Sequence, residues 1–320
     1  MEVAKPPRRL PLKFLLLAFL IAIIIGGLAF GSVRISPANL LATISQLLFA
    51  ARSGWTAETI IVWQLRLPRV LLAATVGASL ATAGAILQGI LRNSMADSYI
   101  LGVSAGASLG AATAMYFGLK VTLLGLGSVA TSALIGALAA TFSVISIATR
   151  IAKKSTLSML LTGIAMSSFL SAVVSLMVYI SKDRIQPMIF WLMGSFAARG
   201  WPHLFLALPY LVVGYGIAII YHRQLTAISL SDATAHNLGV NVSAVRLILL
   251  IATSILTAAS VAVSGVIGFV GLMIPHVART LVGHEYRLVL PVSAIIGAIF
   301  LAGADILART VLRPVELPVG

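Results

Sequence analysis

The chain has 320 residues, of which 60% are hydrophobic and 9% are charged, and its mean hydropathy is +1.07. This composition excludes a water-soluble protein and leaves no room for a soluble domain, so residues 1–320 are expected to form a single transmembrane domain. The net charge is +14 and there is no cysteine, which excludes disulfides, thiolate metal sites and cysteine nucleophiles.

Apolar runs of membrane-crossing length recur along the whole sequence. Crossing a hydrocarbon core of ~30 Å takes ~20 mostly apolar residues in a helix. The first run follows basic residues but is too long for the apolar region of a signal peptide, so it is expected to be a retained helix. The pattern predicts an all-α polytopic bundle with about nine crossings. They lie near 14–33, 70–91, 99–119, 121–147, 156–180, 204–220, 245–263, 268–281 and 288–307.

The run at 268–281 is short and contains Pro275, which predicts a broken or partial crossing packed among other helices. His276 follows directly and is expected near the inner end of this helix. A buried, hydrogen-bonded histidine is favoured over a metal ligand, because no second histidine or carboxylate lies at ligand spacing. No metal site is therefore expected.

Basic residues are spread over both sides of the expected bundle. With the N-terminus inside, only slightly more than half of the 22 lysines and arginines fall on inner segments. The outer ones are mostly arginine, which suits bidentate pairing with carboxylates. A basic outer face favours an acidic protein partner, with anionic lipid headgroups as the alternative.

Two polar segments interrupt the apolar pattern. On the outer side, residues 36–68 include a stretch at 40–49 that could form a surface helix. On the inner side, the loop at 221–245 contains a short helix that Ser231 or Asp232 could cap and Gly239 could end. An ordered inner helix could be a binding site for another protein, although the loop could also merely join two crossings.

Small residues recur at helical spacing in the second and third helices. Gly77, Gly84 and the GxxxG pair Gly106 and Gly110 predict close helix packing, within the bundle or at a dimer seam. Gly102 to Gly106 also fits the hydrolase pattern G-x-S-x-G around Ser104. A serine hydrolase is disfavoured, because the motif opens an apolar helix and no spacing links it to a histidine.

Asp305 and Arg309 lie four residues apart on the last helix, where a structural ion pair is expected and a role in an aqueous cavity is the second interpretation. Other ionisable residues are scarce in the spans, which disfavours a stand-alone secondary transporter or channel, the alternative function. The sequence has no G-x-x-x-x-G-K-[ST] motif for nucleotide phosphates. Uphill transport would need energy from a separate subunit.

Several stretches resemble the FecCD permease family, the membrane subunits of ATP-binding cassette (ABC) importers for cobalamin, haem and ferric siderophores. The similarity follows the family's order over nearly the whole chain. The matching stretches are LRLPR at 65–69, GAILQG at 84–89, RNSMADSYILGVS at 92–104, WLMGSF at 191–196, NLGV at 237–240, GFVGLMIPHVAR at 268–279, ADILAR at 304–309 and ELPVG at 316–320.

The resemblance implies a type II ABC importer permease in a prokaryotic inner membrane, with its N-terminus in the cytoplasm. It implies a homodimer in membrane lipid with two ATPase subunits on the inner side and one substrate-binding protein on the outer side. ATP and Mg²⁺ would bind to the ATPase, so this chain would hold no cofactor, bind no nucleic acid and catalyse no reaction.

The resemblance also assigns roles to particular residues. The ATPase-coupling loop would include Ser231, Asp232, His236, Leu238 and Gly239. The binding protein would dock on Arg66, Arg69, Arg309 and Arg313. Thr162, Gly163, Met166 and Ser167 would line the translocation path, with Ser155 and Thr156 near an inner gate.

The sequence departs from the family pattern in three places. Ser94 and Ser98 replace prolines, which predicts a looser turn into the third helix. His236 stands where arginine is common, which predicts a different or pH-sensitive contact with the ATPase. Family members have ten helices, and the tenth, which follows the ELPVG stretch, is expected to be missing from this chain.

Overall fold

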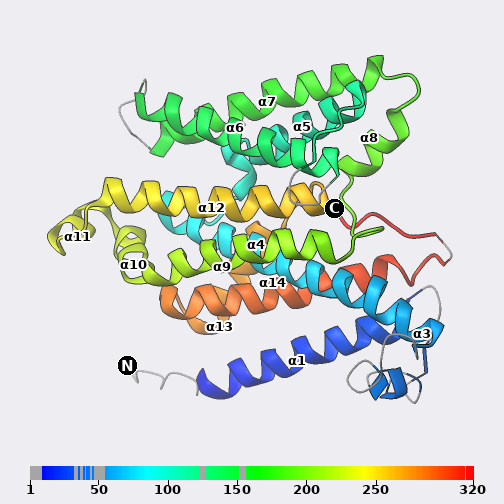
Figure 1. Ribbon diagram of the computed structural model, residues 1–320. Coiled ribbons are helices and arrows are strands. Elements are labelled where there is room, and N and C mark those ends of the chain that lie inside the picture. Colours follow the sequence, from blue (N-terminus) through cyan, green and yellow to red (C-terminus); the bar gives the residue numbers. More distant parts are fainter. Residues whose placement is uncertain are drawn as a thin grey trace.

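The computed structural model is an all-helical bundle (Figure 1). It describes residues 9–31, 35–36, 39, 41–43, 45–46, 55–122, 127–150, 156–313 and 315–320, and these contain no β-strand. The elements are α1 (Arg9–Ala29), α3 (Ala57–Ile60), η2 (Ile61–Arg66), α4 (Leu67–Leu91), η3 (Ser98–Leu101), α5 (Val103–Phe117), α6 (Ser128–Arg150), α7 (Thr156–Ile180), α8 (Ile185–Leu192), α9 (Trp201–Ile220), α10 (His222–Leu230), α11 (Asp232–Asn237), α12 (Val242–Ser264), α13 (Val270–Val282) and α14 (Tyr286–Ala308).

Each of the nine expected apolar runs contains a helix, which confirms the predicted fold class. Within the described residues, 7 helices are long and apolar enough to cross a membrane, and α13 is a shorter apolar helix. The second crossing begins earlier than expected, because α3, η2 and α4 form one stretch over Ala57–Leu91. The surface helix expected at 40–49 falls largely outside the described residues.

The α4 helix forms the centre of the bundle and is buried along almost its whole length. It lies between α12 and α14, with α1 along one edge of the bundle and α6 and α7 along the opposite edge (Figure 1). Its glycines allow close backbone contact: a Cβ at Gly77 would lie 2.1 Å from the carbonyl oxygen of Gly297, and one at Gly84 would lie 1.9 Å from that of Gly271. Any side chain at these positions would force α14 or α13 away.

The GxxxG pair of α5 serves the same purpose inside the chain. A Cβ at Gly106 would lie 2.4 Å from the carbonyl oxygen of Gly136, and one at Gly110 would lie 2.0 Å from that of Ser132. This face of α5 therefore packs on α6 of the same chain, as the prediction of a tight bundle requires.

Of the two alternatives for this run, a partial crossing agrees with the 13 residues of α13, whereas the expected break at Pro275 was wrong, because the helix runs through this residue without interruption. Proline cannot donate to the carbonyl four residues back, here that of Gly271. Gln88 of α4 compensates, since its side-chain nitrogen lies 3.2 Å from the Gly271 oxygen and 3.1 Å from the Leu272 oxygen. The chain instead turns sharply before α13, where Gly265 and Phe269 both have positive φ angles.

Two groups of polar residues lie at opposite ends of the bundle. The α11 helix lies at the end where α1 begins, whereas α3 and the last residues of the chain lie at the other end (Figure 1). We call them the α11 end and the α3 end.

Candidate functional site

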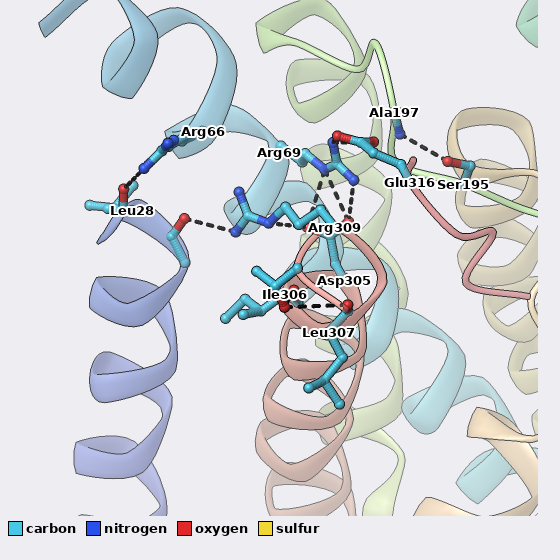
Figure 2. Close-up of polar contacts among 12 residues, drawn as sticks. Leu28, Arg66, Arg69, Ser195, Ala197, Asp305, Ile306, Leu307, Arg309 and Glu316 are labelled. Atoms are coloured by element: carbon cyan, nitrogen blue, oxygen red, sulfur yellow. Dashed lines mark hydrogen bonds and ion pairs between the residues drawn. The ribbon is translucent and has the colours of Figure 1, made fainter. Parts of the chain in front are cut away.

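A buried cluster of charged residues, here called the arginine cluster, joins three helices at the α3 end (Figure 2). Arg69 of α4 is its centre: Nη2 and Nε donate to Asp305 of α14 at 2.8 and 3.0 Å, and Nη1 donates to Glu316 at 2.9 Å. The Asp305 side chain is fully buried, whereas that of Glu316 is 35% exposed. The cluster comprises Arg66, Arg69, Asp305, Arg309 and Glu316.

Arg66 and Arg309 hold the end of α1. The last carbonyl oxygens of a helix have no partners within it and carry partial negative charge. Arg66 donates to the carbonyl oxygens of Leu28 and Ala29 at 2.6 and 3.0 Å, and Arg309 donates to that of Gly27 at 2.7 Å. Two guanidinium groups therefore fasten α1 to α4 and α14.

Asp305 and Arg309 form the ion pair that their spacing predicts, with Oδ2 and Nε 3.5 Å apart. Burial lowers the pKa of Arg309 to about 10, and the neighbouring Arg69 and Arg66 act in the same direction while Asp305 opposes it. The cluster therefore combines the guanidinium groups of three arginines with the carboxyl groups of Asp305 and Glu316.

Arg66 is the last residue of the π-helical turn η2, and Pro68 follows this turn at the start of α4. In η2 the backbone bonds span five residues, as in that from Leu67 N–H to the Val62 carbonyl. The next such bond would run from Pro68 to Trp63, but proline has no N–H to donate. The indole Nε1 of Trp201 donates to the Trp63 oxygen instead, at 3.0 Å. The start of α9 is thereby fixed to η2.

A cavity of about 340 Å³, here called the arginine pocket, opens beside this cluster. Arg66, Arg69, Arg199 and Arg309 line it, with Glu316 as its acidic group. Burial lowers the pKa of Arg199, whose Nη1 lies 3.3 Å from Nε2 of His203. Four guanidinium groups around one carboxylate make this pocket suited to an anion, and above all to a planar carboxylate.

At the opposite end, α11 is fixed by caps at both ends. The Ser231 hydroxyl accepts the Thr234 N–H at 2.9 Å, so the serine is the N-cap rather than Asp232. Gly239 has φ +77° and follows the helix, with Gly239 N–H bonded to the His236 oxygen at 2.9 Å and Val240 N–H to the Ala235 oxygen at 3.0 Å. These are the two bonds of a Schellman motif.

Asp232 ties α11 to the core. It accepts from Arg246 of α12 at 3.0 Å and lies 3.5 Å from a guanidinium nitrogen of Arg92, the residue that ends α4. Leu238, the residue at which α11 ends, is 69% exposed. The helix therefore presents an apolar side chain outward while its acidic residue contacts two buried helices.

The residues expected along the translocation path lie on α7. Gly163 packs against η3, since a Cβ there would lie 1.9 Å from the Ile100 oxygen. Met166 and Ser167 both lie close to Gly102, and Thr162 is half-buried. Ser155 and the side chain of Thr156 lie outside the described residues. The neighbouring face of α7, which includes Leu161, Ile164 and Ser168, is exposed in the single chain.

Two further predictions concern His276 and Ser104. His276 is exposed on α13, so the expected burial was wrong. Its helix has buried residues at positions 274, 275 and 278, and position 276 faces away from that side. Ser104 is buried near the start of α5, which follows a 3-10 helix rather than the strand that a nucleophile elbow requires.

Three elements of the two sites were not predicted from the sequence. The first two are the role of Glu316 and the pairing of Arg69 with Asp305. Arg69 lies 236 positions from Asp305 and 247 from Glu316 along the chain. The third is the pairing of Asp232, a predicted residue, with Arg92 and Arg246. Three of the four predicted docking arginines are buried in contacts within the chain, and Arg313 is half-buried after α14.

The chain is similar to known membrane permeases over most of its length. The sequence model of the FecCD transport family matches residues 16–320. The chain is 40% identical to the hemin transport system permease HmuU of Yersinia pestis, over 98% of this chain and 91% of that one. It is 44% identical to the cobalamin import system permease BtuC of Halobacterium salinarum, over 82% and 69%.

A solved structure is also similar over nearly the full length. It is a metal-chelate type ABC transporter in an inward-facing conformation, with a TM-score of 0.84 and 31% identity, covering 97% of this chain and 93% of that one.

Proposed function

The chain belongs to the FecCD transport family, and on this premise we propose that it carries a metal chelate, such as a ferric siderophore, haem or cobalamin, across the membrane. It is an integral-membrane permease subunit of an ABC importer. Membership of this family argues against the alternative function, a stand-alone transporter or channel.

The observation that carries the proposal is the position of the two sites at opposite ends of the bundle. The arginine pocket at the α3 end has the charge to receive an acidic side chain of a substrate-binding protein. The capped α11 helix at the other end is the surface for an ATPase subunit. We place the α3 end outside the cell membrane and the α11 end, with the N-terminus, in the cytoplasm of a prokaryote.

Docking on the outer side would use Arg66, Arg69, Arg309 and Arg313. The first three are buried, so a partner carboxylate would meet them by entering the arginine pocket rather than on a flat surface. Glu316 already occupies one side of Arg69, which leaves the pocket with an excess of positive charge.

Coupling on the inner side would pass through Asp232. When ATP closes the ATPase dimer, a displacement of α11 would act on α12 through Arg246 and on α4 through Arg92. The α4 helix is bonded to α13 through Gln88 and to α14 through Arg69. Ser231, His236, Leu238 and Gly239 would set the position and the contact surface of α11.

A second copy of the chain would complete the path. Only 17% of the apolar window in Ser158–Ile180 is buried within one chain, so most of the surface of α7 is left uncovered. We propose that two chains form a homodimer, with Thr162, Gly163, Met166 and Ser167 near the path and Ser155 and Thr156 near its inner gate. Residues 1–320 would act as one permease domain, in contact with lipid.

The proposed chemistry belongs entirely to the partners. ATP and Mg²⁺ would bind to two ATPase subunits, and this chain would hold no cofactor, bind no nucleic acid and move its cargo without changing it. The absence of a phosphate-binding G-x-x-x-x-G-K-[ST] motif in the full sequence supports this division.

The test is reconstitution of this chain with its ATPase subunit in proteoliposomes, with and without the binding protein. We expect the binding protein to stimulate ATP hydrolysis and uptake of its chelate. Ion-driven uptake by this chain without any ATPase would contradict the proposal. Cobalamin, haem and a ferric siderophore tested side by side would identify the cargo.

A further inference from the structure

An aromatic groove lies directly beside the arginine pocket. It has a volume of about 520 Å³, and Trp55, Trp63 and Trp201 line it together with Ile60 and Pro202. The Trp63 ring lies 4.9 Å from that of Trp201 and 6.1 Å from that of Trp55, measured between centroids. We call this hollow the tryptophan groove.

The groove is preformed. The bond from Trp201 Nε1 to the Trp63 oxygen joins two of its walls, and it exists because Pro68 leaves that oxygen without a backbone donor. Trp201 also stacks on Phe205 at 5.6 Å, one turn further along α9. Aromatic side chains held in this way lose little conformational freedom when a partner binds, which favours tight binding.

The tryptophan groove and the arginine pocket form one continuous surface. Gln64 and Gly200 line both hollows. Gly200 leaves the junction open, since the nearest atoms to a Cβ placed there are 3.9 and 4.0 Å away. One part of this surface therefore carries four guanidinium groups and the adjoining part carries three indoles.

Tryptophan is common where a membrane meets water, so lipid is the alternative occupant of the groove. The adjoining charge favours a protein. A partner loop with a carboxylate beside an apolar side chain would match both halves at once, whereas an acyl chain would match only the aromatic half.

We propose that the tryptophan groove is the second half of the docking surface for the binding protein. It receives an apolar or aromatic side chain from the same loop whose carboxylate enters the arginine pocket. This inference rests on the proposed function. It assigns selectivity between binding proteins to the groove, because an apolar side chain must fit a shaped hollow, whereas any acidic residue can satisfy the arginines.

The test measures the affinity of the substrate-bound binding protein for the permease–ATPase complex in lipid nanodiscs. The variants are Trp55→Ala and Ile60→Glu. Ile60 is 42% exposed, so the second change places a negative charge in the groove without opening the core. The matched control is Phe117→Ala, an aromatic residue that is 66% exposed and lies on α5, outside the groove.

We expect the two groove variants to bind about tenfold or more weakly and the control to bind like the wild type. Wild-type affinity in both groove variants would overturn the inference. The Arg313→Glu variant separates the two proposals. If it binds more weakly while the groove variants bind normally, the groove inference alone fails. If the wild-type complex binds no binding protein, the proposed function fails with it.

A second measurement distinguishes lipid from protein in the groove. The chain has 4 tryptophans, so Trp191→Phe leaves only the three that line the groove. In nanodiscs with brominated phosphatidylcholine, we expect a tryptophan-free form of the binding protein to reduce quenching of their fluorescence. Strong quenching that the binding protein does not change would show lipid in the groove and would overturn the inference.

Discussion

Arg69 and Asp305 form a two-point ion pair between α4 and α14 at the α3 end of the bundle, with Arg69 nitrogens 2.8 and 3.0 Å from the same carboxylate oxygen. The Asp305 side chain is fully buried and that of Arg69 is 11% exposed. Removing such charges from water is costly, and the cost is offset only if their hydrogen bonds are satisfied. Glu316 and Arg309 supply further opposite charges on either side of the pair.

Removing Asp305 should therefore destabilise the protein severely. Asp305→Ala leaves Arg69 and Arg309 buried without their shared partner, and we expect a loss of about 3–5 kcal/mol. Glu316→Ala is the matched control, because Glu316 bonds to the same arginine but is 35% exposed; we expect a loss below about 1 kcal/mol. Thermal unfolding in detergent compares the two, and equal losses would contradict this account of the cluster.

The contribution of Gln88 to stability should depend on Pro275, because the proline removes the backbone donor that Gln88 replaces. Gln88→Leu leaves the Gly271 oxygen without its side-chain donor, and we expect a loss of about 1–3 kcal/mol. Pro275→Ala restores an N–H that can reach that oxygen. In the double variant the loss should shrink, and thermal unfolding of all four proteins measures the coupling. Strictly additive effects would show that the two residues act independently.

The caps of α11 should control coupling to ATP hydrolysis. Ser231→Ala removes the N-cap and should destabilise the helix by about 1 kcal/mol, whereas Ser231→Asp retains a capping oxygen. Binding-protein-stimulated ATPase activity should fall in the alanine variant and be largely retained in the aspartate variant. Equal activity in both would show that the cap has no part in coupling.

Substitutions at Gly239 should affect the C-terminal end of α11 in the same way. It has φ +77° and a Cβ there would meet no atom within 4 Å, so a substitution strains only the backbone. Gly239→Ala should cost roughly 1–2 kcal/mol, and Gly239→Asn less, because asparagine tolerates this conformation. We expect stimulated ATPase activity in the order glycine, asparagine, alanine. An alanine variant as active as the wild type would contradict this prediction.

Docking on the outer side should depend on salt. Arg313 is half-buried and lies outside the buried cluster. We therefore expect Arg313→Glu to lower the affinity of the binding protein for the permease at low ionic strength without unfolding the chain. The loss should shrink as salt rises, because screening shortens the range of the charges. Titrations at 20 mM and 300 mM NaCl measure it, and a loss that does not change with salt would exclude an electrostatic role.

The sequence predicted those parts of the sites that local geometry determines. Residues four apart on a helix share a face, which is why the Asp305–Arg309 pair could be foreseen. Capping depends on residues within one turn, so a short capped helix between Ser231 and Gly239 was also predictable, although the choice between Ser231 and Asp232 was not.

The sequence could not predict contacts that depend on how the helices pack. Pro275 was expected to break its helix, because the sequence does not show that Gln88, 183 positions before Gly271, donates to the Gly271 oxygen. The burial of Arg66 depends on the end of α1, 37 or more residues earlier, whose carbonyl groups it caps. No periodicity or motif encodes these distances, since they arise only when α4 is enclosed by its neighbours.

Two of the prolines that leave a backbone oxygen without its helical donor are paired with a side chain on another helix: Pro68 with Trp201, and Pro275 with Gln88. Each pair therefore constrains sequence change at two distant positions together. Among relatives, loss of Gln88 should be tolerated where position 275 is not proline, and loss of Trp201 where position 68 is not. In each pair, the proline should be replaced before the side chain that compensates for it.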